Sequence, residues 1–166
     1  MRIRTATPAD LDAVADLETV CFPPAEAAGR DAVAARLTAY PDRVWLGLDE
    51  EDGHGGPSLL ACINGMRTSV PDLTDEMFSH AELHEPDGSW QMIFSVMTSP
   101  ERRGEGLAGR LLEHVIAVSR ADECRGLVLT AKAGLLGFYA RYGFVDEGVC
   151  PSDHGGAVWH QMRLAL

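Results

Sequence analysis

The spacing of apolar residues and the turn-forming residues between them predict four helices. Between residues 11 and 21, and again between 107 and 119, apolar residues recur three or four positions apart, as on the buried face of a helix. The first segment follows Thr7-Pro8, a capping residue and a proline suited to the first helical turn. Turn-forming residues bound two further helical segments, at 30–40 and 135–142.

Shorter runs of β-branched and large apolar residues predict strands between these helices. The run at 90–98 is apolar almost throughout, which is typical of a central strand buried on both faces. Residues 68–89 combine weak periodicity with many acids, so we expect a long functional loop that includes one helical turn. The remaining predicted strands cover residues 2–6, 43–48, 58–66, 127–130, 144–147 and 157–164.

The alternation of strands and helices predicts an α/β fold, with a single domain over residues 1–166. A chain of 166 residues can bury a core without a metal or a disulfide. The four cysteines lie far apart and form no C-x-x-C pair. This spacing disfavours a zinc site or a dithiol motif, and we expect no metal.

The balance of charge narrows the range of partners. A formal net charge of −11 disfavours a nucleic-acid surface and favours cationic ligands, although the acids at 49–52 and 72–87 could equally serve to solvate loops. No apolar run approaches the ~20 residues of a membrane span, and the N-terminus lacks the pattern of a signal peptide. We therefore expect a cytoplasmic protein without nucleic-acid or membrane partners.

A glycine-rich segment between the 90–98 strand and the helix near 107 carries the clearest chemical signal. It reads RRGEGLAG at 102–109. Glycines let the backbone approach a ligand closely, and the start of the next helix presents unpaired N–H groups at the positive end of its dipole. The two arginines add positive charge, so the segment predicts a cradle for a pyrophosphate or a ribose phosphate.

The same glycines also fit a dinucleotide site or a simple turn. Gly104, Gly106 and Gly109 match a dinucleotide-binding fingerprint, but the next strand ends in Thr130-Ala131-Lys132 where that fold requires a ribose-binding acid. No Lys-Ser or Lys-Thr pair follows the glycines, which excludes a P-loop. The remaining alternative is a tight strand-to-helix turn without a ligand.

The segment resembles the acetyl-coenzyme A motif of the GCN5-related N-acetyltransferase (GNAT) superfamily, through Arg103, Gly106 and Ala108. A second motif of that superfamily is met by FYARYGF at 138–144. The resemblance covers the whole chain and implies a mixed sheet built in a fixed order: strand, two helices, a two-stranded hairpin, a splayed strand, helix, strand, helix and a final hairpin. Within the superfamily the chain looks most like the arylalkylamine N-acetyltransferase-like branch, through LHEPDG at 83–88 and CFPPAEA at 21–27.

The resemblance implies transfer of an acetyl group from acetyl-coenzyme A (acetyl-CoA) to a primary amine by direct attack in a ternary complex. The acceptor expected is a small arylalkylamine or a polyamine-like molecule. Acetylation of a protein N-terminus or lysine is the alternative, as is a coenzyme A sensor with little catalysis. The implied coenzyme-binding residues are Val96, Met97, Thr98, Arg103, Gly104, Glu105, Gly106, Leu107, Ala108, Gly109, Lys132 and Phe138.

The resemblance also implies roles in proton transfer. Tyr139 matches the tyrosine that protonates the departing thiolate. Glu26, His84 and His154 are candidate general bases, with Glu26 the first choice, because the branch's two relay histidines are here Met92 and Phe94. We expect a monomer or a homodimer. The predicted acceptor-binding residues are Phe22, Pro24, Met92, Phe94 and His154.

Overall fold

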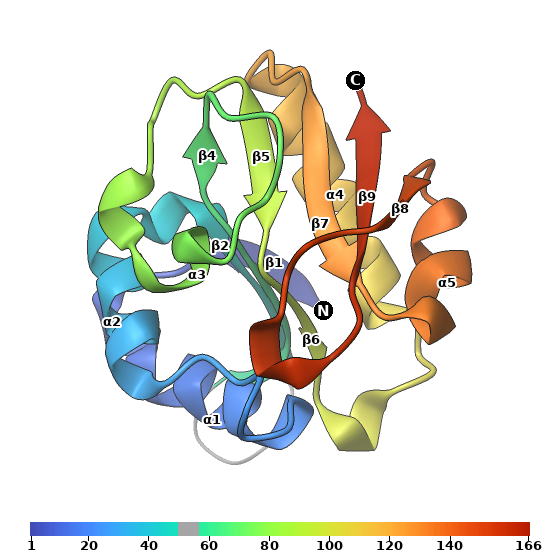
Figure 1. The fold of residues 1–166 in the computed structure, drawn as a ribbon. Coiled ribbons are helices and arrows are strands. Elements are labelled where there is room, and N and C mark those ends of the chain that lie inside the picture. Colours follow the sequence, from blue (N-terminus) through green and yellow to red (C-terminus); the bar gives the residue numbers. More distant parts are fainter. Residues whose placement is uncertain (50–56) are drawn as a thin grey trace. The chain divides into compact units, whose positions relative to one another are not determined.

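A computed structural model describes residues 1–49 and 57–166 (Figure 1). Three of the acids predicted as part of a charged stretch, at 50–52, lie outside the described residues. The described chain forms two compact units, one of Met1–Asn64 with Ser95–Val115 and the other of Gly65–Phe94 with Ile116–Leu166. Within the described ranges, no helix is long and apolar enough to cross a membrane.

The first unit is a four-stranded antiparallel sheet with helices. Its strands pair in the order β1-β2-β3-β6. Its elements are β1 (Arg2–Thr5), α1 (Leu11–Cys21), α2 (Arg30–Ala39), β2 (Val44–Asp49), β3 (Ser58–Asn64), β6 (Ser95–Thr98) and the first part of α4 (Leu107–Ala121), with single 3-10 turns at Pro8–Asp10, Pro41–Arg43 and Pro100–Arg102.

Apolar faces of α1 and α2 form the core of this unit together with the sheet. Val14 and Leu17 on α1 and Leu37 on α2 pack in one buried cluster with β2, β3 and Met97 of β6. Val14 and Leu17 are positions that the helical spacing marks in the sequence. Burying them removes apolar area from water, which is the main favourable contribution to folding.

The second unit is a five-stranded mixed sheet with strand order β4-β5-β7-β9-β8 (Figure 1). Strands β5 and β7 are parallel and the other pairs are antiparallel. Its elements are β4 (Arg67–Thr68), α3 (Glu76–Ser79), β5 (Trp90–Ile93), the rest of α4, β7 (Gly126–Ala131), α5 (Leu136–Ala140), β8 (Val145–Val149) and β9 (His160–Ala165), with 3-10 turns at Ala81–Leu83, Ala133–Leu135 and His154–Gly156.

The run at 90–98, predicted as one strand, is two strands that meet at Phe94. Residues before Phe94 pair with β7, and residues after it pair with β3. The apolar pattern concealed the break because residues on both sides of it are largely buried. The predicted strand 58–66 also ends early, at Asn64. There the chain passes so close to β5 that a Cβ on Gly65 would lie 1.7 Å from the Met92 carbonyl oxygen.

Candidate functional site

The loop between β6 and α4 takes a backbone conformation that requires its glycines. Gly104 has a φ of +85° and Gly106 a φ of +75°. This left-handed region costs a non-glycine residue roughly 1–2 kcal/mol. A Cβ built on either glycine would meet no described atom within 4 Å. The glycines are therefore required by the path of the backbone rather than by crowding, and the space beside them is open.

The start of helix α4 follows the same loop. Helix α4 begins at Leu107, directly after Gly106, and the first N–H groups of any helix lack an intrahelical acceptor. The residues from Arg103 to Gly106 are exposed. An exposed helix start with a flexible glycine backbone is a site for an anion. A pyrophosphate fits this cradle, because the open space lies where glycine side chains are absent.

The two arginines of the loop are used differently. Arg102, predicted to add positive charge for a phosphate, donates to Glu105 from Nε at 2.7 Å and to Asp49 from Nη1 at 3.1 Å. These carboxylates raise the pKa of Arg102 and neutralise its charge. Arg103 is exposed and donates to the thiol of Cys21. Of the two, Arg103 is therefore the one suited to a phosphate.

Strand β6 offers a second surface for the coenzyme. In the sheet, β6 lies at the end of the strand order and, among the described strands, pairs only with β3. The Ser99 N–H donates to Leu60 at 2.8 Å, so by the alternation of an antiparallel ladder Met97 also turns its backbone toward β3. The backbone groups of Val96 and Thr98 face the open edge. Of the three predicted residues, Met97 thus has no backbone donor for a ligand there.

Tyr139, the predicted acid, lies at the end of α5 among aromatic rings. Its side chain is 7% exposed, and its ring centroid is 5.0 Å from that of Phe138 and 5.9 Å from that of Phe144. Burial raises the pKa of Tyr139 to about 12. The hydroxyl therefore stays protonated at neutral pH, as a proton donor must. Phe138 is half-buried, with the Arg141 guanidinium 5.4 Å from its ring centroid.

An aromatic cluster in the second unit brings together two of the predicted acceptor residues. Phe78 stacks on His154 with centroids 4.7 Å apart and contacts Phe94 at 5.1 Å. His154 in turn lies 6.1 Å from Trp159, whose Nε1–H donates to the His154 carbonyl at 2.8 Å. Lys132, predicted at the coenzyme, places its Nζ 5.4 Å from the Trp159 centroid. The cluster is a wall suited to an apolar or aromatic ligand.

Phe78 and Trp159 were not predicted as site residues. Phe78 lies in a segment with weak periodicity, and a single tryptophan in a strand-like run is more often core than ligand-binding. Met92, predicted beside Phe94, is placed differently. Its side chain is 0% exposed. Gln91 and Ile93, on the other face of β5, are as buried as Met92, so both faces of the strand are covered and the acceptor contact assigned to Met92 stays a prediction.

The two candidate bases outside the aromatic cluster, His84 and Glu26, lie in different settings. The Nδ1 atom of His84 accepts from the backbone N–H of Arg67 at 3.1 Å, so the ring holds its loop against β4. Glu26 is half-buried in a turn where its N–H donates to Pro23 at 2.9 Å. Among the predicted acceptor residues nearby, Phe22 packs on the core of the first unit and Pro24 is exposed.

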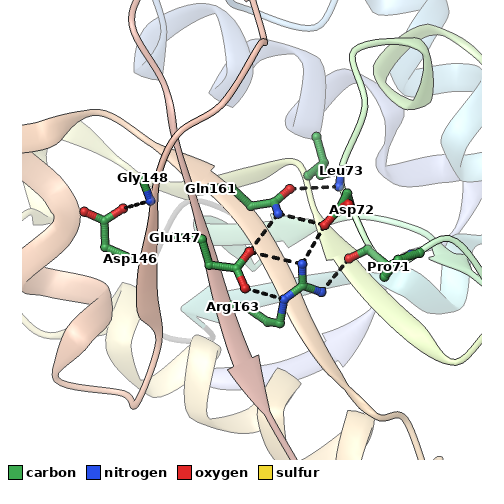
Figure 2. A network of polar contacts seen from close by, with 8 residues as sticks. All are labelled: Pro71, Asp72, Leu73, Asp146, Glu147, Gly148, Gln161 and Arg163. Atoms are coloured by element: carbon green, nitrogen blue, oxygen red, sulfur yellow. Dashed lines mark hydrogen bonds and ion pairs between the residues drawn. The ribbon is translucent and has the colours of Figure 1, made fainter.

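The second unit also contains an acidic hollow of about 540 Å³. Figure 2 shows the polar network at its edge, where Arg163 donates to Glu147 at 2.7 Å and to Asp72 at 2.6 Å. Gln161 bridges the same two carboxylates. The contacts join the loop after β4 to the β8–β9 hairpin. The hollow is lined by Asp72, Leu73, Thr74, Asp75, Glu147, Gly148, Val149, Cys150, Pro151, Ser152 and Gln161.

The chain is similar to known proteins in sequence and in fold. The sequence model of the acetyltransferase (GNAT) family matches residues 11–144. No protein of curated function matches the sequence significantly.

Several solved structures share the fold. The GphF GNAT-like decarboxylase in complex with isobutyryl-CoA has a TM-score of 0.81 at 22% identity, over 99% of each chain. The loading GNATL domain of CurA from Lyngbya majuscula has a TM-score of 0.82 at 18% identity, over 99% of this chain and 96% of that one. A GNAT family acetyltransferase from Brucella melitensis in complex with acetyl-CoA has a TM-score of 0.62 at 21% identity, over 99% and 87%. These likenesses confirm the predicted α/β fold.

Proposed function

The chain belongs to the acetyltransferase (GNAT) family, and from this premise we propose that it transfers an acetyl group from acetyl-CoA to a primary amine. The loop before α4 carries the proposal. Gly104 and Gly106 hold it in a left-handed conformation, and the space beside both is open. The N–H groups there suit the pyrophosphate of the coenzyme. The N–H groups of Val96 and Thr98 on the open edge of β6 suit its pantetheine amides, as an added strand would.

Bound acetyl-CoA supplies an activated acetyl carbonyl, and the chain's own residues then handle protons. Tyr139 holds a proton on its hydroxyl, since its pKa is about 12, and gives it to the departing sulfur. The acceptor amine must lose a proton to attack. Of the three candidate bases, His154 lies in the aromatic cluster, whereas the Nδ1 of His84 is bonded to Arg67. Glu26 remains the alternative to His154.

The acceptor we propose is a small amine with a flat apolar body, such as an arylalkylamine. Phe78, Phe94 and Trp159 supply aromatic faces. Asp72 and Glu147 are paired with Arg163, so of the acids of the hollow it is Asp75, which accepts from Ser152 and the Asp153 N–H, whose charge attracts an ammonium group. The LHEPDG and CFPPAEA segments support assignment to the arylalkylamine N-acetyltransferase-like branch. Polyamines are the other small acceptors that the acidic residues would favour.

The proposal is tested by measuring release of free coenzyme A thiol from acetyl-CoA in the presence of separate acceptors. The panel contains arylalkylamines, polyamines and short peptides with free N-termini or lysines. We expect saturable turnover with arylalkylamines above the rate of acetyl-CoA hydrolysis. Turnover confined to peptides would replace the acceptor class with proteins.

Two further outcomes would overturn the proposal. Tight coenzyme binding without turnover across the panel would indicate a coenzyme A sensor. Since one structure of the same fold is a GNAT-like decarboxylase, carboxylated acyl-CoA without an amine is included as well. Loss of carbon dioxide from that compound, with no amine acetylation, would indicate a different reaction at the same coenzyme loop.

A further inference from the structure

A carboxylate lies buried in the first unit, on the apolar face of α1. Glu18 is 1% exposed and falls between Val14 and Cys21 on the same helical stripe. A charged group at such a position is costly unless several hydrogen bonds satisfy it. Glu18 Oε1 accepts from Ser95 Oγ at 2.5 Å and from Asn64 Nδ2 at 3.4 Å, and Oε2 accepts from the Ala28 N–H at 3.3 Å.

A buried cation, Arg36, is linked to this carboxylate through one intervening side chain. Arg36 on α2 is 4% exposed, and its Nη1 donates to Asn64 Oδ1 at 2.9 Å. Asn64 therefore stands between Glu18 and Arg36 and bonds to both. Burial lowers the pKa of Arg36, while Glu18 and Tyr40 act in the opposite direction. The result is a chain of polar contacts from the helices to the strands.

The partners of Glu18 are the segments that the coenzyme site uses. Ser95 is the first residue of β6, directly before Val96, whose backbone faces the open edge. One helical turn after Glu18, the thiol of Cys21 donates to the Thr98 carbonyl at 3.3 Å. Helix α1 thus holds β6 at both ends. Ala28 closes the segment that begins at Phe22, which contains the candidate base Glu26.

We propose that Glu18 is a positioning residue that sets β6 and the 22–28 segment for binding the coenzyme, an inference that rests on the proposed function. Apolar side chains would pack α1 against the sheet as well or better, because a buried ion adds little net stability. Directional hydrogen bonds instead fix the position of β6 along its own axis relative to α1. Glu18 touches neither substrate in this account and acts through Ser95 and Ala28.

The test compares Glu18→Ala, Ser95→Ala and the double variant. Calorimetric titration with coenzyme A gives the dissociation constant, and amide hydrogen exchange reports on β6 without any coenzyme. We expect each single variant to raise the dissociation constant about tenfold, or 1.4 kcal/mol, and the double variant to add little more. Exchange of the Ser99 amide, bonded to Leu60, should quicken more than exchange of the β1–β2 amides.

A matched control separates positioning from stability. Leu37→Ala removes a core side chain of α2 that is 2% exposed and destabilises the same unit. We expect it to lower the melting temperature without changing the coenzyme dissociation constant more than twofold. Glu18→Gln, which keeps an acceptor for Ser95, should restore most of the affinity if Glu18→Ala folds poorly.

The outcomes distinguish this inference from the proposed function. Unchanged affinity in folded Glu18→Ala, with uniform exchange across the sheet, would overturn the positioning role while the coenzyme site stands. Failure of the wild-type protein to bind coenzyme A would overturn the proposed function. In that case, exchange at Ser99 still decides whether Glu18 holds β6.

Discussion

The coenzyme loop and the aromatic cluster are built in different ways. The loop is one stretch of chain from Arg103 to Gly109, and its binding groups are backbone N–H groups placed by two glycines and a helix start. The cluster joins side chains from four places, Phe78, Phe94, His154 and Trp159. A backbone site depends on local conformation, whereas a side-chain site depends on the packing of distant segments. The first therefore leaves a sequence motif, and the second leaves almost none.

The largest expected effect is a loss of coenzyme affinity when the coenzyme loop alone is changed. Gly106→Glu puts a side chain where φ is +75° and a negative charge where the pyrophosphate would bind. We expect the dissociation constant for acetyl-CoA to rise about 100-fold or more, equivalent to about 2.7 kcal/mol. Calorimetric titration measures it.

Its control is Gly148→Ala, since Gly148 has a φ of +94° in the β8 strand of the other unit. That variant carries comparable backbone strain and should bind acetyl-CoA normally. Equal losses in both variants would mean that strain, and not the loop, governs affinity.

The next largest effect is on the rate of acetyl transfer and leaves the affinity for the coenzyme unchanged. Tyr139→Phe removes the proposed proton donor but keeps the ring between Phe138 and Phe144. We expect kcat to fall about 100-fold at neutral pH, with an unchanged dissociation constant for acetyl-CoA. Steady-state kinetics across pH 6 to 10 provides the measurement. The control is Tyr142→Phe, which changes a half-buried neighbour of Phe138 and should leave kcat within twofold. Full activity of Tyr139→Phe would remove Tyr139 from the mechanism.

A smaller effect, on use of the amine acceptor, should separate the aromatic cluster from the coenzyme loop. Trp159→Leu opens the aromatic cluster beside His154. We expect kcat/KM for an arylalkylamine to fall about tenfold, equivalent to about 1.4 kcal/mol, with coenzyme affinity unchanged. The matched variant is Trp90→Leu, which alters a tryptophan of β5 that packs against Arg163. If both variants lower kcat/KM equally, the cluster is a structural feature and not the acceptor wall.

The smallest effect is on stability in alkali and compares one tyrosine from each unit. Burial raises the pKa of Tyr40 and of Tyr139 to about 12, against about 10 in the unfolded chain. The neutral forms are favoured in the fold, so stability is full below pH 10 and is lost as pH rises toward 12. At pH 11 each tyrosine should cost about 1 kcal/mol of unfolding free energy.

Denaturant unfolding at pH 9 and pH 11 measures this loss. Tyr139→Phe should reduce it by about half, since a phenylalanine ring has no proton to lose. An identical loss in the wild type and in Tyr139→Phe would show that the Tyr139 hydroxyl titrates as in the unfolded chain.

Sequence reasoning reached most of the fold because periodicity reports on local burial. The end of helix α1 at Cys21 agrees with the prediction, whereas the predicted first turn at Pro8 is a separate 3-10 turn before Leu11. The break at Phe94 was not expected from the apolar pattern, because strand partners are chosen by tertiary structure. Glu18 does leave a signal in the sequence, because it is an acid on the apolar stripe of a helix.

In the candidate site too, local features could be predicted from the sequence, whereas contacts between distant residues could not. Gly104 and Gly106 were predicted to let the backbone approach a ligand, and this stays a prediction; their positive φ values are a separate requirement for glycine that the sequence analysis did not state. Arg102 was predicted beside the phosphate, yet its pairing with Asp49 could not be foreseen, because the two are 53 positions apart. Roles assigned to Tyr139 and to the candidate bases stay predictions.

The most direct test of the central claim is calorimetric titration of the wild-type protein with acetyl-CoA, beside Arg103→Ala and Gly148→Ala. The account predicts saturable binding by the wild type and by Gly148→Ala, and affinity about tenfold lower in Arg103→Ala, where a charged contact to phosphate is lost. Absence of binding by the folded wild-type protein, or equal affinity in all three, would contradict it, and the loop before α4 would then be a turn without a ligand.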